Sequence, residues 1–392
     1  MLYKREEFIS EFTRIGKTPT VFKKIQYNDN NYVNNDSLTN NTAKVISTTL
    51  FPTFLTSTLV SEENYQLKKI NHRNYSGAGI AVSNSDSIES FLNKNLKSQI
   101  RKNLRRTINR LDECFNISYA YYHGSITEEK YELILDTLKI LLEKRFDQKK
   151  MINHFLTEWT KNTDGLFELI NQKKASFFVV YDNKKPISIS VNRHYENSML
   201  FSNCNGYDLD YSKFGLGHLD NYLLVKWCIE NKYDFLDLGS GVIEYKKRWC
   251  NVYYDFEYHI YYKKNSISAS FLAFIEINKI KLKNLVKKLK LDVFLKKIRS
   301  NIKPSKSYTN QTKFSYKVNK IDAFNDFDKT KLKKLDITLK ETEHIRQPIY
   351  DYLYLNKMHV DTTLIYEVLS DTNTFIFETP KDIIQIILTN ED

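Results

Sequence analysis

The chain has 392 residues, enough for two or three domains with separate cores, and its 41% hydrophobic and 14% aromatic content excludes a disordered protein. Its 59 Lys and Arg against 47 Asp and Glu leave a net charge of +12, which predicts an anionic partner such as a nucleotide, nucleic acid, lipid headgroup or acidic polymer. Four scattered cysteines without a CxxC pair favour neither a zinc site nor a disulfide framework. Since no run of about 18 apolar residues occurs, we expect a cytoplasmic protein, soluble or peripheral to a membrane.

Residues 1–113 form a first region of short β-like runs, interrupted by an Asn-rich stretch at 28–42 that we predict to be an exposed loop. The region ends in an amphipathic helix with apolar positions every three or four residues: Leu96, Ile100, Leu104, Ile108 and Leu111. Residues 94–110 hold seven Lys or Arg and no acidic residue. This basic face is either solvated or guides an anionic substrate.

Residues 114–265 have the pattern of a regular α/β domain. We expect strands at 117–123, 175–194 (a hairpin turning at Asp182-Asn183), 199–204, 234–238 and 253–262, and helices at 127–146, 152–172, 217–231 and 243–249. Thr127 is the predicted N-cap of the first helix.

Two regions follow. Residues 266–304 are a basic amphipathic helical segment, with ten Lys or Arg and only Asp292 as an acid between 279 and 303. This segment is either a packing helix with a lysine-rich outer face or a helix that lies on an anionic membrane. Residues 305–392 form a small α/β domain of unknown role, with a strand predicted at 374–378 and a helix at 381–388.

The segment 199–250 is the most informative part of the chain. A predicted strand leads through a polar loop to Gly215-Leu216-Gly217 and then into a helix. The first amides of a helix have no intrahelical acceptor, and glycine lets a phosphate approach the backbone. The turn is either such an anion site or an ordinary loop before a helix.

This order of elements resembles the fold of the GNAT acyltransferases. The local motifs are similar to the branch related to cellulose- and exopolysaccharide-biosynthesis acetyltransferases (CelD-like) and to FemAB-type peptidoglycan bridge enzymes. The motifs are Lys97-Ser98-Gln99-Ile100-Arg101-Lys102-Asn103-Leu104, Tyr211-Ser212-Lys213-Phe214-Gly215-Leu216-Gly217, Tyr233-Asp234-Phe235-Leu236-Asp237-Leu238-Gly239 and Glu244-Tyr245-Lys246. The resemblance covers about residues 85–255.

The resemblance implies a tandem α/β fold, with a degenerate GNAT-like half at 1–113, a complete acyltransferase domain at 114–265, and the small domain outside it. It implies transfer of an acetyl or other acyl group from acyl-CoA to an amine or hydroxyl, without a metal. The implied acceptor is an amino sugar or glycan precursor in bacterial cell-envelope or polysaccharide synthesis.

The resemblance also assigns site residues. Those expected to hold the acyl carrier are Lys213, Phe214, Gly215, Leu216, Gly217 and His218. Asp237 is the expected base or the residue that orients one, Tyr245 the proton donor, and Lys246 an anion ligand, while Asn203 and Asn205 are expected to bind the acceptor. The alternatives are a turn aspartate and a surface Tyr-Lys pair, and His218 is as consistent with a packed histidine as with a base.

Two other functions stay open. An aminoacyl-tRNA-dependent transferase of the peptidoglycan-bridge type would use the large positive charge to bind tRNA phosphates. A degenerate acyltransferase that serves as a scaffold would use residues 305–392 as its interaction module.

Overall fold

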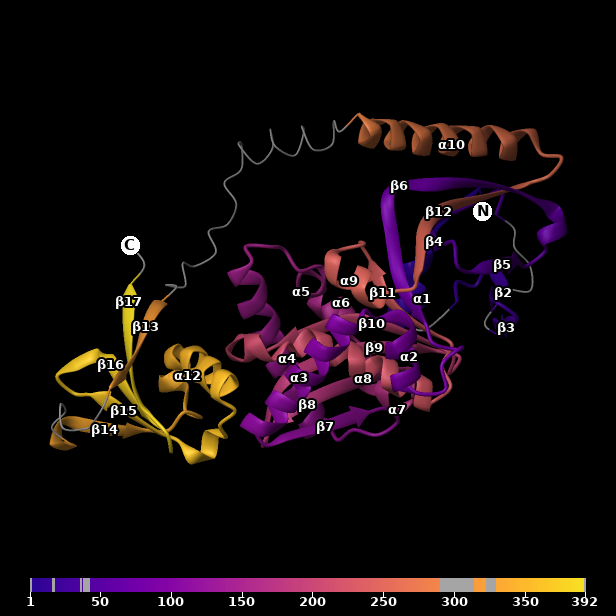
Figure 1. Ribbon diagram of the computed structural model, residues 1–392. Helices are drawn as coiled ribbons and strands as arrows, with labels where there is room; N and C mark the ends of the chain where they lie inside the picture. The colour runs from indigo at the N-terminus through magenta and orange to yellow at the C-terminus, as the bar shows by residue number, and fades with distance from the viewer. Residues whose placement is uncertain are drawn as a thin grey trace, which may run out of the picture.

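The computed structural model describes residues 2–15, 18–35, 37, 43–289, 314–321 and 329–390. Residues 290–303 of the predicted basic segment therefore lie outside the described residues, as do 36 and 38–42 of the Asn-rich stretch. The α/β class predicted from the sequence is confirmed, because helices cover both faces of a central mixed sheet (Figure 1).

The central sheet has nine strands. In spatial order they are β1 (Tyr3–Glu7), β4 (Val45–Pro52), β12 (Val252–Lys263), β6 (Tyr65–Ala81), β11 (Phe235–Ser240), β10 (Met199–Tyr207), β9 (Lys185–Tyr195), β8 (Ala175–Asp182) and β7 (Ile117–Tyr122). β12 follows the predicted acyltransferase region in sequence but lies between β4 and β6. The predicted division at residue 113 therefore divides the sequence but not the sheet.

The two parts of the sheet join where β11 pairs antiparallel with β6. A Cβ atom at Gly77 would lie 2.3 Å from the ring of Tyr254, and one at Gly79 would lie 2.2 Å from the ring of Phe235. Glycine is needed at both positions because the aromatic rings cross the β6 backbone there.

Helices pack on both faces of the sheet. They are α1 (Phe8–Ile15), α2 (Ile88–Asn95), α3 (Ser98–Cys114), α4 (Glu128–Gln148), α5 (His154–Thr157), α6 (Trp159–Thr163), α7 (Leu166–Asn171), α8 (Leu216–Glu230) and α9 (Glu244–Trp249). α2, α3 and α8 cover one face through a core that includes Leu104, Leu224 and Leu236. α4 and α7 cover the other face of β8 and β9.

The sequence located most of these elements, with two differences. The hairpin of β8 and β9 and the Thr127 cap, whose side chain accepts from the Lys130 amide, are confirmed. The single helix predicted at 152–172 is wrong: the chain forms three short helices there, and Gly165 starts the last of them with φ 64°. Part of the predicted loop at 28–42 is also a strand, β3 (Asn30–Val33), which pairs with β2 (Phe22–Tyr27) and forms a small sheet with β5 (Thr56–Leu59).

A long helix, α10 (Ile267–Lys288), follows β12 and lies across β12, β6 and β4. Ala273 and Ile280 pack against Val45, Tyr258 and Ile260 of the sheet. Figure 1 shows α10 as a straight helix along the upper edge of the molecule.

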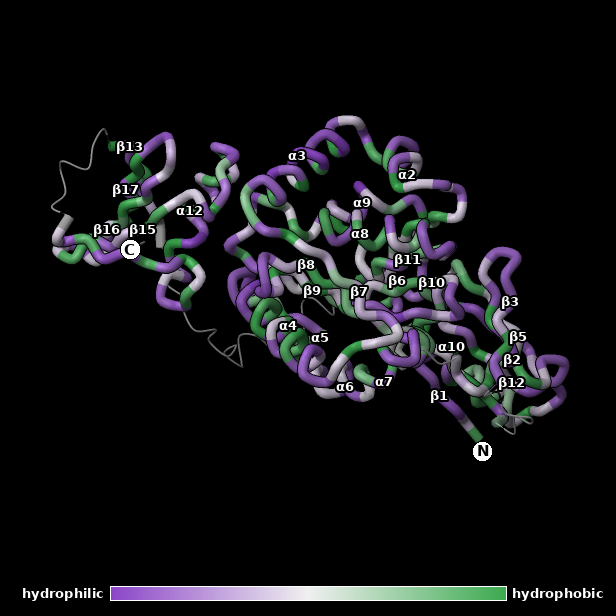
Figure 2. The backbone as a smooth tube through the Cα atoms, turned by 90° about the horizontal axis from the view of Figure 1, so that it is seen from below, coloured by the Kyte–Doolittle hydropathy of each residue, from purple (hydrophilic) through white to green (hydrophobic). Residues whose placement is uncertain are grey.

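The C-terminal region forms a five-stranded antiparallel sheet with one helix, and Figure 2 shows it as a separate lobe at the opposite end from the N-terminus. Its elements are β13 (Phe314–Ile321), β14 (Leu332–Leu335), α12 (Glu343–Asn356), β15 (Leu364–Val368), β16 (Asp371–Glu378) and β17 (Ile383–Asn390). The strand predicted at 374–378 is confirmed within β16. The helix predicted at 381–388 is wrong, because β-branched isoleucines favour a strand and every second residue, Ile384, Ile386 and Leu388, is buried between β13 and β16.

The C-terminal lobe docks on the loop that precedes α8. This loop is a 3₁₀ helix, η2 (Leu209–Phe214); the others are η1 (Glu62–Asn64), η4 (Lys329–Lys331), η5 (Lys340–Thr342) and η6 (Val360–Thr362). The ring of Tyr350 in α12 lies 4.9 Å from that of Tyr211 in η2 and 4.8 Å from that of Phe115. The lobe therefore supports the chain just before the glycine turn.

Candidate active site

The site lies where two parallel strands separate. β10 and β11 pair only from Met199–Phe201 to Phe235–Asp237, and β10 then continues alone to Tyr207 along β9. A bulge between Ser202 and Cys204 bends β10 at this point. The separation opens the carboxyl ends of both strands, which is where open α/β sheets bind ligands.

A cavity of about 640 Å³ fills this opening. Its walls come from five elements: β10, the end of β11, the start of α8, the end of α4 with the following loop, and α9. Of the residues predicted from the sequence, seven line it: Asn203, Asn205, Gly215, Leu216, Gly217, His218 and Tyr245. The structure thus brings the glycine turn, the two asparagines and the tyrosine together.

The glycine turn has the geometry of an anion site. Gly215 has φ 58°, a conformation that glycine adopts without strain, and its carbonyl accepts from the amides of His218 (2.8 Å) and Leu219 (3.2 Å). Two of the four amides predicted to hold phosphate are therefore engaged. The amides of Leu216 and Gly217, the first two of α8, have no intrahelical acceptor by their position.

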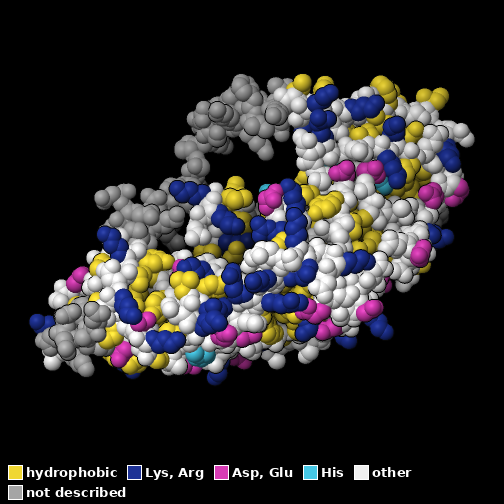
Figure 3. All heavy atoms as spheres, in the orientation of Figure 1, with side chains coloured by type: hydrophobic (Ala, Val, Ile, Leu, Met, Phe, Trp, Pro, Cys, Tyr) yellow, Lys and Arg dark blue, Asp and Glu magenta, His cyan; other side chains and the backbone are white. Residues whose placement is uncertain are grey.

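Basic helix α3 borders this turn. A Cβ atom at Gly215 would lie 3.2 Å from Cγ2 of Thr107. On the same helix Lys102, Arg105 and Arg106 are exposed, and Figure 3 shows Lys and Arg side chains gathered over the middle of the face where α3 and α9 lie. Positive charge next to free helix-start amides favours binding of a phosphate group.

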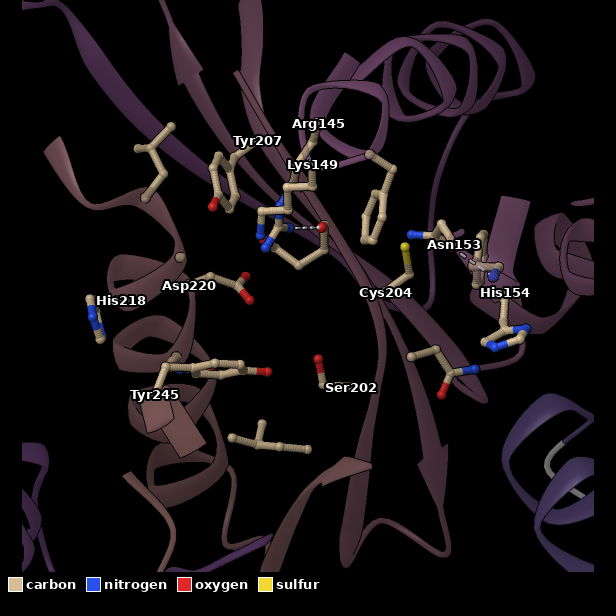
Figure 4. Close-up of a pocket in the computed structure, with 18 of the residues that line it drawn as sticks. Arg145, Lys149, Asn153, His154, Ser202, Cys204, Tyr207, His218, Asp220 and Tyr245 are labelled. Carbon is tan, nitrogen blue, oxygen red and sulfur yellow. Dashed lines mark hydrogen bonds between the residues drawn. The ribbon is translucent and has the colours of Figure 1, made fainter. Parts of the chain in front are cut away.

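Asp220 is the acidic group of the cavity, and the sequence analysis missed it. Its carboxylate accepts from the side chains of Ser190 and Asn205, and its burial raises the pKa to about 7, against the lowering effect of these bonds and of Arg145. In Figure 4 it points into the cavity from α8. An acid in the first turn of the helix after a glycine loop was the available signal, but a helix-start aspartate is also a common stabilising feature.

Arg145 and Lys149 place two positive charges one turn apart on the end of α4. Arg145 donates to the backbone oxygen of Asn205 (2.8 Å), and its guanidinium carbon lies 4.1 Å from the ring centre of Tyr207. Its Nε is buried and makes no hydrogen bond to a described residue. Partial burial, together with the charge of Arg145, lowers the pKa of Lys149. An anionic group in the cavity would relieve this repulsion.

Tyr245 faces Asp220 across the cavity. In Figure 4 its hydroxyl points into the same space as Asp220 and Ser202. Although 40% of the residue is exposed, partial burial raises the pKa of Tyr245 to about 12. The phenol therefore remains protonated at neutral pH and can donate a proton.

Asp237 and Lys246, two of the three predicted catalytic residues, do not line the cavity. Asp237 is on the opposite face of β11 from Leu238, which does line it, and accepts from the Tyr254 hydroxyl (2.6 Å). Lys246 is buried and donates to the carbonyls of Gly239 (3.0 Å) and Ser240 (2.7 Å).

These two residues instead hold the turn that follows β11. Asp237 also accepts from the backbone of Gly239, and the attraction between Asp237 and Lys246 favours the charged form of each. Burial has the larger effect on both: it raises the pKa of Asp237 to about 6 and lowers the pKa of Lys246. The turn leads into α9, so this pair positions Ser240 and Tyr245 at the cavity wall.

Three residues predicted to bind the carrier have other contacts. His218 accepts from the indole N–H of Trp249 through Nδ1 (3.0 Å), and burial, with the charge of Arg248, lowers its pKa. Its neutral ring thus carries the proton on Nε2 and is a donor rather than a base. Lys213 pairs with Asp351 of α12 (3.2 Å), and Phe214 is buried; neither lines the cavity.

Two further properties bear on the chemistry. In the part of the chain that the structure describes, no three His, Cys, Asp or Glu side chains are grouped so as to hold a metal ion. Over the same residues, no helix is both long and apolar enough to cross a membrane.

Comparisons with known proteins agree with this geometry for the central part of the chain. Residues 98–247 match the model of the acetyltransferase (GNAT) domain, from α3 to α9. No curated protein matches the sequence.

Several solved structures share part of the architecture, and three illustrate the range. A conserved protein of unknown function from Bacteroides thetaiotaomicron is 12% identical (TM-score 0.37), with 52% of this chain and 64% of that one covered. FemX is 11% identical (TM-score 0.39; 55% and 72% covered), and L-PGS from Bacillus licheniformis is 12% identical (TM-score 0.34; 59% and 71% covered). The chain thus spans just under two thirds of the first of these proteins.

The family match covers the strand separation, the glycine turn, Asp220 and Tyr245, which together form the cavity. Residues 98–247 are therefore a GNAT-type acetyltransferase domain, the catalytic type of a transferase.

Proposed function

We propose that the protein transfers an acetyl or other acyl group from acyl-CoA to an amine or hydroxyl acceptor. The observation that carries this proposal is the placement of Asp220 and Tyr245 in one cavity that begins at the free amides of the glycine turn. A base, an acid and an anion cradle are the parts that direct acyl transfer requires.

The acyl carrier would bind at the start of α8. The amides of Leu216 and Gly217 would hold its pyrophosphate, and the exposed cations of α3 would lie near its other phosphates. Its pantetheine arm would enter the opening between β10 and β11 and bring the thioester to Ser202 and Cys204. Burial raises the pKa of the Cys204 thiol to about 12, so Cys204 is a wall of the site and not a nucleophile.

The transfer would proceed in one ternary complex. Ionised Asp220 would take the proton from the acceptor while its nitrogen or oxygen forms a bond to the acyl carbon. The carbon–sulfur bond would then break, and the leaving thiolate would take the proton of the Tyr245 hydroxyl. A base with a pKa of about 7 is half ionised at neutral pH, which suits this role.

The acceptor would enter beside Asn203 and Asn205, opposite the carrier. Amide side chains at this wall suit a hydroxylated acceptor, and the Arg145–Lys149 pair suits one with a phosphate or carboxylate. These features support an amino sugar or glycan precursor, as expected for the CelD-like branch and for envelope or polysaccharide synthesis in the cytoplasm.

Calorimetric titration with acetyl-CoA and a thermal-shift series of CoA thioesters would test the donor. Ligand at ~100 times its Kd should add about 2.7 kcal/mol to the free energy of unfolding. Gly217→Val should abolish binding, because a Cβ at this position already lies 3.5 Å from Tyr207. Gly217→Ala is the matched control and should retain most of it. Absence of saturable binding to the unchanged protein would contradict the proposal and favour the degenerate scaffold.

The basic surface over α3 and α9 favours a second candidate, an aminoacyl-tRNA-dependent transferase. Filter binding of bulk tRNA across a salt series separates the two. Contacts to several phosphates would reduce the binding constant about 10³-fold or more between ~50 and ~200 mM salt. Weak binding with no such dependence would remove this candidate.

A further inference from the structure

We propose that α10 docks the protein on an anionic lipid surface through the outer face of the helix. We name this face the α10 stripe. It consists of the exposed apolar residues Ile267, Phe271, Phe274, Leu282, Leu285 and Leu289. The proposal concerns a surface away from the cavity and does not depend on the acyl-transfer assignment.

The α10 stripe is a continuous line of large apolar side chains. Its members are separated by four, three, eight, three and four residues, so all lie on one side of the helix. They are strongly exposed: Ile267 is 91% exposed, Phe271 63% and Phe274 64%. Scattered exposed apolar residues are ordinary, but an aligned set of six on one helix marks an interaction surface.

The opposite side of α10 is already in use. Ala269, Ala273, Glu276 and Ile280 are buried, with spacings of four, three and four. Glu276 accepts from the Ser47 hydroxyl (3.1 Å), which fixes the rotation of the helix on the sheet. The α10 stripe therefore cannot turn inward without loss of this packing.

The ends of α10 are also held. Lys44 donates to Ser268 (2.8 Å), and Asn284 bonds to the Asn71 backbone (2.8 Å) and accepts from the Arg73 amide. The helix thus presents a fixed apolar ridge to its surroundings.

The charges of the helix select an anionic surface as the occupant. Between Ile267 and Leu289 there are five lysines: Lys279, Lys281, Lys283, Lys287 and Lys288. The single acid is Glu276, which faces the sheet. Figure 3 shows hydrophobic side chains standing along the upper edge of the molecule, with Lys or Arg between them. Apolar residues flanked by lysines are what an interfacial helix needs, since they enter the acyl region while the lysines meet the headgroups.

A second copy of the chain fits this face less well. In a symmetric pair of α10 helices the lysines on each would face lysines on the other, and the stripe has no exposed acid to pair with them. A nucleic acid would match the lysines but not the phenylalanines. The sequence after the helix adds five further Lys or Arg between 290 and 303, which extends the positive charge.

Vesicle co-sedimentation of the full chain tests the proposal. The protein should sediment with equimolar phosphatidylcholine–phosphatidylglycerol vesicles, weakly with phosphatidylcholine alone, and less as salt rises. The double substitution Phe271→Glu and Phe274→Glu should lower the partition coefficient more than tenfold. Lys281→Ser and Lys288→Ser should each lower it about fivefold on the mixed vesicles only.

The matched controls are Leu133→Glu and Ile140→Glu on α4, where the side chains are 47% and 50% exposed. They should leave vesicle binding unchanged, and all variants should keep the melting temperature of the unchanged protein. Vesicle binding that is absent, or that survives the phenylalanine substitutions, would overturn the proposal. So would a dimer in sedimentation velocity that those substitutions dissociate, since the stripe would then be covered by a second copy.

Discussion

The regions around Asp220 and Asp237 each bury an aspartate whose pKa burial raises, to about 7 and about 6. Asp220 faces a cavity beside Arg145 and Tyr245, where a ligand can reach it. Asp237 faces packed aromatic rings and is closed in by Tyr254 and the turn that Lys246 holds. A shifted pKa alone therefore does not identify a base, because the same burial occurs in a structural clamp.

The largest expected effect separates these two carboxylates directly. Asp220→Asn should lower kcat/KM for acyl transfer by about 10²–10⁴-fold, because the general base is lost. In the unchanged protein kcat/KM should rise with pH and level off above a pKa near 7, since only the ionised carboxylate accepts a proton. Steady-state kinetics with a panel of amines across pH would measure both.

Asp237→Asn is the matched control for that experiment, because it makes the same change in a carboxylate outside the cavity. It should leave the pH profile in place. An equal loss of activity in both variants, or a profile that disappears only in the Asp237 variant, would reverse the assignment.

Lys246→Met tests the clamp and should lower the free energy of unfolding by about 3 kcal/mol. The substitution leaves the Gly239 and Ser240 carbonyls without a charged donor and Asp237 without its positive neighbour. Denaturant unfolding measures the loss. Lys247→Met, in the exposed neighbouring position, should cost less than about 0.5 kcal/mol. A fully stable but inactive Lys246 variant would instead support its direct role in catalysis.

Tyr245→Phe should lower kcat by about 10–100-fold with little change in KM, since it removes a proton donor and retains the ring. A thioester with a more acidic leaving thiol should lose less, because its thiolate needs no proton. Kinetics with two such donors would measure the difference. A loss of the same size for both would assign Tyr245 to binding rather than to proton donation.

The smallest effect concerns stability. The folded-state pKa of Asp220 lies above its ordinary value of 3.8, so the folded protein holds a proton that the unfolded chain releases. The contribution of Asp220 to stability is therefore present below pH ~4 and is lost as pH rises through about 7. Asp220→Asn should be more stable than the unchanged protein by about 1–2 kcal/mol at pH ~8, and equal near pH ~4. Melting curves at both pH values would show it; a variant less stable at pH ~8 would contradict the buried-charge account.

Much of the local structure was predictable from the sequence. Apolar spacing located α3, α4 and α8, alternation located β8 to β10, and Gly215-Leu216-Gly217 marked the turn at the start of α8. These features arise between residues a few positions apart, so the sequence reports them directly. The β17 error has the same origin: the pattern around Ile384 also fits a helix, and only pairing with β13 and β16 selects the strand.

The assignment of the site needed the tertiary structure. The sequence placed Asp237 and Lys246 in motifs but could not tell which face of β11 opens to the cavity, and it missed Asp220 and Arg145, which meet there from separate helices. In α10 the sequence showed apolar residues around the helix, and only the packing on β12 decided which set is buried and which is the exposed stripe. Periodicity determines which residues share a face, whereas the contacts of that face depend on segments distant in the chain, so only the folded molecule decides them.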